Sequence, residues 1–290
     1  KTGIQAFLWI LDSRIRGSDN LGTFYGPIKF YNPYTFRKIL EFQVVQFRTF
    51  PKAPITEAVL DISVALPNDF DIKNFMPFHD AIRDRFEKRQ ERRMVVGQLK
   101  FSPECIEPVE QQKSNLQGYL FSSEAEKKFI QFRIDGFTFN KLKPYENWEN
   151  FRDEGKQFWE NYREIAVPTK IQRISLRYIN RIELPLPFDD FGEYIQTNPQ
   201  IAPSLPQSVA GFFMRIEVPN PDIGAIAIIN EKMEPPSPDG KLPIILDIDV
   251  LKKHQYATDQ EMWEDFEKLR NFKNDIFFNS ITEKAAELFI

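Results

Sequence analysis

Cysteine and histidine are scarce in this chain. Of 290 residues, one is cysteine (Cys105) and two are histidine (His79 and His254). A single cysteine cannot form an intrachain disulfide, and so few thiol and imidazole groups argue against a Cys/His zinc site. These absences fit a reducing compartment, so we expect a cytoplasmic protein.

Long apolar runs and an excess of basic charge are also missing. No hydrophobic stretch approaches the roughly 20 residues that a membrane span needs. The apolar residues 6–11 are followed by Asp12, Arg14 and Arg16 instead of the cleavage site of a signal peptide. The net charge of -4 and the pI near 5.5 disfavour general binding to nucleic acid or to anionic membranes.

Phenylalanine, by contrast, is abundant. The 28 Phe residues and a hydrophobic content of 42% predict an aromatic-rich core in one large domain or two small ones. The clearest local pattern lies in residues 171–184, where apolar and polar residues alternate. Such alternation predicts a strand with one packed face and one wet face. The wet face carries Arg173, Arg177 and Arg181, with successive guanidinium groups roughly 13 Å apart.

The remaining periodic segments predict an α+β fold. Residues 57–66 form a strand, Pro77 opens a short helix, strands follow near 95–101, 118–122 and 128–141, and a helix covers 145–165. The second half repeats this order with a strand at 171–184, a short helix near 188–195, strands near 212–218, 224–231 and 244–251, and a long C-terminal helix. Thr258 and Glu261 have the spacing of a capping box at the start of that helix. We therefore expect an antiparallel sheet, or sheets, with helices on one face and two similar β-α-β-β-β-α halves.

The two strand-to-helix passages also align in sequence. RIDGFTFNKLKPYENWENF matches DIDVLKKHQYATDQEMWEDF, pairing Trp148 with Trp263 and Phe151 with Phe266. We interpret this as an internal duplication, with one half at 51–168 and the other at 169–290. Both tryptophans are then expected to be buried between their helix and the dry side of the sheet.

Residues 1–50 do not fit either half. The segment IQAFLWILDSRIRGSDN resembles the conceptual translation of a dispersed bacterial intergenic repeat, and we expect residues 1–40 to be dispensable. The alternative for residues 40–50 is an added edge strand, with Phe42, Val44 and Phe47 packing on the domain. We therefore expect residues 1–50 to be a poorly structured N-terminal extension, which is either a translated repeat or an edge strand.

Three segments carry a family resemblance: FPKAPITEAVLDI at 50–62, a W-x-x-F…W-x-x-Y helix, and RISLRYINRIELP at 173–185. Together they resemble a family of sporadically distributed, uncharacterised prokaryotic proteins. The resemblance covers about residues 50–290 and implies no activity, cofactor or site residue. At the level of fold, duplicated β-α-β-β-β-α halves are similar to TATA-binding-like and helix-grip architectures, an analogy that does not license function.

Charged residues on the wet strand faces are the candidate ligand-binding residues. The candidate arginines are Arg133, Arg173, Arg177, Arg181 and Arg215. They predict either bidentate binding of a small anionic ligand, such as a phosphate or nucleotide, or a cross-strand ladder of ion pairs with acidic neighbours. Each pair of such a ladder contributes only about 0.2–1 kcal/mol. The nearly one-for-one interleaving of acids favours the ladder.

A metal site is the alternative chemistry. Asp247 and Asp249, with Asp61 and Glu217, could offer carboxylates to Mg²⁺, but the i, i+2 spacing also occurs in any half-exposed acidic strand. The basic segment 83–93 predicts a solvated helix face, with nucleic acid or an acidic partner as the alternative. Neither histidine lies near a recognisable nucleophile motif, so a surface or capping role is expected for both.

The absence of a catalytic signature favours a binding function. We expect a non-enzymatic ligand-binding, partner-binding or regulatory protein that uses the arginine-bearing face and needs no cofactor. The expected partner is a small anionic ligand or a protein. Nucleic acid is not favoured, and no membrane association is expected. The competing hypothesis is a metal-dependent hydrolase or nuclease that uses the aspartates.

Overall fold

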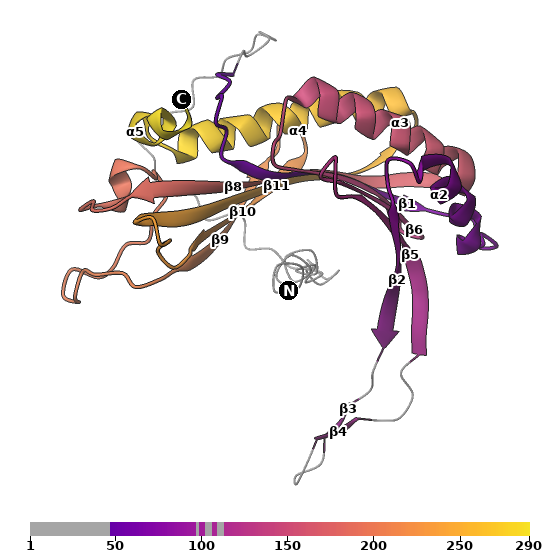
Figure 1. Ribbon diagram of the computed structural model, residues 1–290, viewed down its shortest axis with the longest axis horizontal. Helices are drawn as coiled ribbons and strands as arrows, with labels where there is room; N and C mark the ends of the chain where they lie inside the picture. The colour runs from indigo at the N-terminus through magenta and orange to yellow at the C-terminus, as the bar shows by residue number, and fades with distance from the viewer. Residues whose placement is uncertain (1–46, 97–98, 102–105, 109–112) are drawn as a thin grey trace. The chain divides into compact units, whose positions relative to one another are not determined.

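The architecture is built on one antiparallel sheet. The computed structural model describes residues 47–96, 99–101, 106–108 and 113–290. In these residues nine strands pair in the order β2-β5-β6-β7-β1-β8-β11-β10-β9, and β3 and β4 form a separate two-stranded sheet. Figure 1 shows the large sheet with the helices on one side. The strands of the sheet are β1 (Ile55–Ala65), β2 (Lys88–Val96), β5 (Lys113–Ser123), β6 (Lys128–Arg133), β7 (Gly136–Leu142), β8 (Lys170–Pro185), β9 (Phe213–Asn220), β10 (Ala225–Met233) and β11 (Lys241–Tyr256). The hairpin strands are β3 (Leu99–Phe101) and β4 (Ile106–Pro108).

The order of the strands mirrors itself about the centre of the sheet. β1 and β8 pair with each other, and the order β5-β6-β7-β1 on one side corresponds to β9-β10-β11-β8 on the other. Each half ends in a long helix, α3 (Trp148–Ala166) or α4 (Asp259–Ser280). The α+β class with an antiparallel sheet is therefore confirmed, and the two halves share one continuous sheet. The duplication of the sequence itself stays a prediction.

The helices cover one face of the sheet. α3 packs on β7 while α4 packs on β8 and β11, and Figure 1 shows α2 (Met76–Ile82), α3 and α4 on the same side. The remaining short elements are the helix α5 (Glu283–Ala286) and the 3-10 turns η1 (Ile72–Phe75), η2 (Phe191–Glu193) and η3 (Glu287–Phe289). Asn147 caps α3 by accepting from the backbone N–H of Asn150. The strand alternation favours this layering, because the central strands carry mainly apolar side chains on one face and polar side chains on the other.

The core lies between that face and the helices. The sheet contributes side chains such as Leu60, Phe139, Leu176 and Val250, each with no exposed surface. α3 adds an aromatic stripe at helical spacing, made of Trp148, Phe151, Phe158, Trp159 and Tyr162. This layer accounts for much of the high phenylalanine content that the sequence shows.

α3 and α4 lie antiparallel to each other and are joined through polar side chains. Trp148 at the start of α3 donates to Glu267 of α4 over 2.8 Å, while Trp159 near the end of α3 donates to Asp259 at the start of α4 over 2.9 Å. The expected burial of Trp148 is correct, since only 4% of it is exposed. The expectation for Trp263 is wrong in degree. Trp263 is half-buried, and its ring stacks on Phe266 and lies under the ammonium of Lys156.

Some expected elements have different boundaries. The strand expected at 128–141 is a hairpin, because the chain reverses at Ile134 and Asp135 and Gly136 opens β7. Gly136 has φ +152°, and a Cβ there would lie 2.2 Å from the carbonyl oxygen of Ile62. The Asp-Gly dipeptide was the available signal, since glycine commonly closes tight turns. The short helix expected near 188–195 is reduced to the 3-10 turn η2.

The basic segment 83–93 is not a helix face. α2 ends at Ile82, and β2 begins at Lys88 and pairs with β5. The expected solvated helix face is therefore wrong, and Lys88 forms an ion pair with Glu124, just beyond the end of β5. Pairing in the sheet satisfies the backbone of this segment and outweighs the helix propensity of its many Arg, Lys, Glu and Gln residues.

The prediction for residues 1–46 lies outside the described residues, including Phe42 and Val44 of the suggested edge strand. Residues 47–50 are described and form no strand. Phe47 nevertheless packs on the domain, with its ring stacked on Phe278 at 5.6 Å between centroids. Phe50 contacts Phe278 and Phe289.

Candidate functional site

The polar face of the sheet, opposite α3 and α4, gathers most of the candidate residues. At its centre lie Asp61 on β1, Thr138 on β7, Arg173 and Arg177 on β8, and Asp247 on β11. They share a face because strand residues at i, i+2 and i+4 point the same way and antiparallel pairing keeps cross-strand neighbours on one side. We call this set, with the polar side chains that bond to it, the polar face network.

Asp61 organises one half of the network. Its Oδ2 accepts from Arg133 over 3.0 Å and from Thr138 over 2.7 Å, and its Oδ1 accepts from Arg173 over 2.7 Å. Arg133 also donates to Asp135 over 2.8 Å and to Thr138. Arg133 and Asp61 are almost fully buried, with side-chain exposures of 4% and 7%. A buried charge needs such partners, because moving an unpaired charge from water into the protein interior costs several kcal/mol.

Arg177 and Asp247 form the other half. Nε and one terminal nitrogen of Arg177 donate to the two carboxylate oxygens of Asp247, each over 2.7 Å. Asn230 on β10 adds a third hydrogen bond to Asp247 over 3.1 Å. Bidentate pairing of this kind fixes the plane of the guanidinium group as well as its position.

Two further carboxyl groups border these pairs. Asp249 accepts from the hydroxyl of Ser175, and burial raises the pKa of Asp249 above its ordinary value. Glu57 is 5% exposed and accepts from Asn140 over 2.6 Å. Burial raises the pKa of Glu57 too, and the hydrogen bond from Asn140 only partly offsets it. The buried Oδ1 of Asn140 has no hydrogen-bond partner.

The five candidate arginines do not form one cluster. The structure brings Arg133, Arg173 and Arg177 into the polar face network, but Arg181 pairs with Glu183 and Glu234 nearer the end of β8. Arg215 lies on β9, the last strand of the sheet, and pairs with Glu217 over 2.9 Å. The cross-strand ladder expected from the interleaved acids is thus present at the centre of the sheet.

The aspartates proposed for a metal are otherwise engaged. Both oxygens of Asp247 face Arg177, and Asp249 bonds to Ser175. Across the described part of the chain, no three Asp, Glu, His or Cys side chains are arranged to hold a metal ion. Glu217, the fourth carboxylate considered, lies on β9 and not beside Asp61.

The histidines lie apart from the polar face network. His79 donates through Nε2 to the carbonyl oxygen of Phe86 over 3.0 Å, and its ring stacks on Phe121. Nε2 of His254 is 3.0 Å from a carboxylate oxygen of Glu261. Each histidine therefore has a local structural contact.

Sequence reasoning missed several members of the network. Thr138, Ser175, Asn140, Asn230 and Glu57 all contribute hydrogen bonds to charged partners or to one another. The signal that could have identified them is the same period-two alternation, since each is a polar residue on the wet face of a strand, and Thr138 and Ser175 also have apolar neighbours on either side. Attention to charged residues alone passes over such neutral donors and acceptors.

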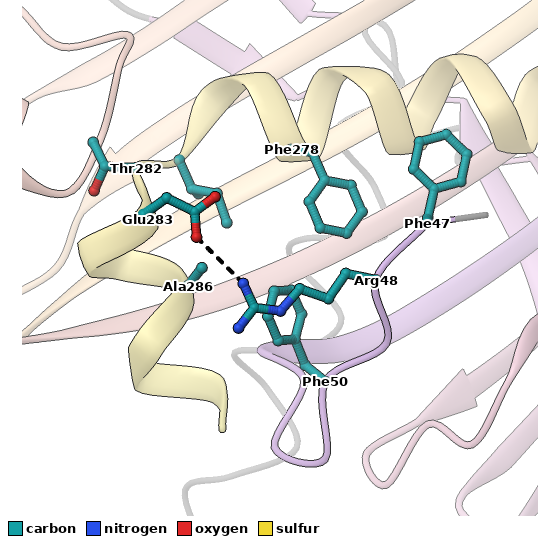
Figure 2. A pocket seen from close by; sticks show the side chains of 8 residues that line it. Phe47, Arg48, Phe50, Phe278, Thr282, Glu283 and Ala286 are labelled. Carbon is teal, nitrogen blue, oxygen red and sulfur yellow. Dashed lines mark hydrogen bonds and ion pairs between the residues drawn. The ribbon is translucent and has the colours of Figure 1, made fainter. Parts of the chain in front are cut away.

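A cavity of about 230 Å³ lies elsewhere, between α4, α5 and the segment at 47–50. Figure 2 shows Phe47, Phe50 and Phe278 along its wall and Arg48 reaching toward Glu283, to which it donates over 3.3 Å. Its volume is below the roughly 300–1,000 Å³ usual for ligand pockets. Both charged groups are also well exposed, so their pairing is weak.

Among the described helices, none combines the length and the apolar character needed to cross a bilayer. The resemblance drawn from the segments at 50–62 and 173–185 stays a prediction. No protein-family model matches the chain, and no curated protein is significantly similar to it.

Proposed function

We propose that this is a non-enzymatic binding or regulatory protein, located in the cytoplasm, whose polar face network docks a protein partner. The observation that carries the proposal is that Arg173 and Arg177 are both ion-paired and partly exposed. Their side chains are 30% and 20% exposed, and carboxylate partners hold both in place on the face opposite α3 and α4. Preorganised guanidinium groups lose less conformational entropy on binding than free ones.

The charge balance supports a protein partner over a small anion. Asp61, Asp135 and Asp247 already neutralise Arg133, Arg173 and Arg177, so an incoming phosphate would compete with fixed carboxylates. A surface that presents donors and acceptors of both signs suits a protein surface of matching pattern. The same face also carries an exposed apolar side chain, Ile226 of β10 at 40% exposure, and a mixture of arginines and apolar residues is typical of protein interfaces.

The test compares binding by the wild type with variants that alter the face but keep the fold. Arg173→Ala removes one exposed guanidinium group. Arg177→Met with Asp247→Leu removes an ion pair as a unit, because deleting only one member would leave a partly buried charge alone. Arg163→Ala is the matched control, since Arg163 is an ion-paired arginine on α3, away from the polar face.

Binding is measured by affinity capture from cell lysate with identification of the retained proteins, and by melting temperature with pyrophosphate, ATP and a single-stranded oligonucleotide. We expect a specific protein to bind the wild type and the Arg163→Ala control and to be lost with both face variants. The small anions and the oligonucleotide should leave the melting temperature unchanged. A melting shift with pyrophosphate that disappears in the face variants would replace the protein partner with a small anion. Equal capture of the protein by all variants would show that the polar face network does not bind the partner.

A further inference from the structure

The strand β9 ends the sheet and is exposed on both of its faces. In the described residues no strand pairs with its outer edge. Exposed fractions reach 65% for Phe213 on the polar side and 37% for both Ile216 and Val218 on the helix side. An end strand that offers apolar side chains on both faces is a template for pairing with another strand.

The backbone groups that β9 offers follow from its register with β10. The N–H of Met233 donates to the carbonyl oxygen of Phe212 over 3.1 Å, and this pair continues the β9-β10 register. In an antiparallel ladder every second residue bonds to the neighbour, so Met214, Ile216 and Val218 are directed to β10. Phe213, Arg215 and Glu217 therefore direct their N–H and C=O groups outward, and Pro219 offers only its carbonyl.

We infer that a second copy of this chain pairs with β9 through the same strand, antiparallel, about a two-fold axis at Ile216. In that register Arg215 of each copy lies opposite Glu217 of the other, and both residues have outward backbone groups. On the helix side, Ile216 meets its own counterpart and Met214 meets Val218. Both faces of the junction are thus complementary, with two opposite-charge pairs on one side and apolar pairs on the other.

Other registers of the same pairing are disfavoured. A shift by two residues in either direction places Arg215 opposite itself or Glu217 opposite itself, and like charges directly opposite are destabilising. A shift by one residue places the outward N–H and C=O groups of one copy opposite residues of the other copy whose N–H and C=O groups are already bonded to β10. The charge pattern of β9 therefore specifies one self-complementary arrangement.

The opposite end of the sheet lacks this complementarity. β2 carries Lys88, Arg89, Arg92 and Arg93 against a single acid, Glu91. Two copies of such a strand would repel each other through their excess positive charge. Self-association is thus expected at β9 and not at β2, which gives a closed dimer instead of an open chain of molecules.

The test uses charge reversal at the junction and sedimentation velocity over a range of protein concentrations. Arg215→Glu and Glu217→Arg each create two like-charge pairs, and each should raise the dimer dissociation constant by about tenfold or more. The double variant restores both opposite-charge pairs and should dimerise like the wild type. A mixture of the two single variants should form a heterodimer, because each copy then supplies the charge that the other needs. Lys253→Glu, an exposed reversal inside the sheet, is the control that leaves association unchanged.

A cross-link tests the two-fold axis directly. Ile216→Cys in a Cys105→Ser background places two thiols across a non-hydrogen-bonded pair, where Cβ atoms lie roughly 4.5–5.5 Å apart. Oxidation should give a covalent dimer, whereas Met214→Cys should cross-link poorly because Met214 faces Val218. A wild type that stays monomeric at all concentrations would overturn the inference. So would dimers that persist in both single reversals, a mixture that does not associate, or higher oligomers in place of dimers.

Discussion

Replacing Glu231 with glutamine should remove a pH-dependent weakness of the fold. Glu231 lies on β10 on the helix side, with Leu246 and Met214 as its cross-strand neighbours. It is 2% exposed, and neither carboxylate oxygen has a hydrogen-bond partner. Burial without a nearby opposite charge raises the pKa of Glu231 from 4.5 to about 7.

The sign and size of the effect follow from proton linkage. Between pH 4.5 and about 7 the folded protein keeps a proton on Glu231 that the unfolded chain has released, so this residue lowers stability as the pH rises. A shift of about 2.5 pH units corresponds to about 3 kcal/mol by pH 8. Glu231→Gln cannot ionise, so the variant should match the wild type near pH 4.5 and exceed it by up to that amount at pH 8.

The measurement is urea denaturation of both proteins from pH 4.5 to pH 8.5, reported as the difference in unfolding free energy at each pH. Taking the difference cancels the titration of every other group. Glu164→Gln, at an exposed position on α3, is the matched control and should show no such trend. A difference that stays constant across this range would refute the reasoning and would mean that Glu231 is not held as a buried, unpaired acid.

Three further tests probe burial and ion pairing. Burial lowers the pKa of Lys273 from 10.5 to about 7, so the wild type gains stability as the pH rises from 7 to 10.5. Lys273→Met should be more stable by up to about 5 kcal/mol at pH 6, and most of this gap should close by pH 10.5. A constant gap in denaturation curves would contradict this. Trp148→Ala should lower the free energy of unfolding by about 3–5 kcal/mol and Trp263→Ala by clearly less, because Trp148 is buried and Trp263 is only half-buried. Equal losses of stability in calorimetry would contradict this. Asp247→Ala should cost about 2–3 kcal/mol by leaving Arg177 unpaired, whereas Arg177→Met with Asp247→Leu should be nearly neutral, and an additive loss in the double variant would count against the ion-pair argument.

Much of the sheet could be predicted because strand alternation is a local property. The polar and apolar faces of β8 from Arg173 to Leu184 could be assigned from the alternation alone, without knowledge of the neighbouring strands. Element ends were harder, since the apolar alternation runs on through the β6-β7 turn and hides it. The strand β2, which begins within the basic segment 83–93, could not be predicted. It forms by pairing with β5, a long-range contact that outweighs the local helix propensity.

The position of the candidate site and the pairing of its arginines could be predicted from the sequence, but the partner of each arginine could not. Alternation places Arg133 and Arg177 on the wet face, yet it does not reveal which acid each one meets, since that depends on strand order and register. β8 lies between β1 and β11, so Arg173 reaches Asp61 on one side and Arg177 reaches Asp247 on the other. The interleaved acids thus predict that the arginines are paired, while strand order and register decide which acid each arginine meets.

Unpaired charge lies instead on the face where the sequence pattern suggested none. Glu231 and Lys273 belong to the helix side, where the pattern predicts apolar packing, and both are buried with pKa values moved toward neutrality. Lys273 has one compensating contact, because its Nζ lies 3.8 Å from the ring centroid of Tyr178. Glu231 has no such contact, since Leu246 and Met214 flank it across the ladder. The ion pairs of the polar face network therefore offset much of the cost of burying its arginines and Asp61, whereas Glu231 and Lys273 on the core side have pKa values near 7 that make stability depend on pH.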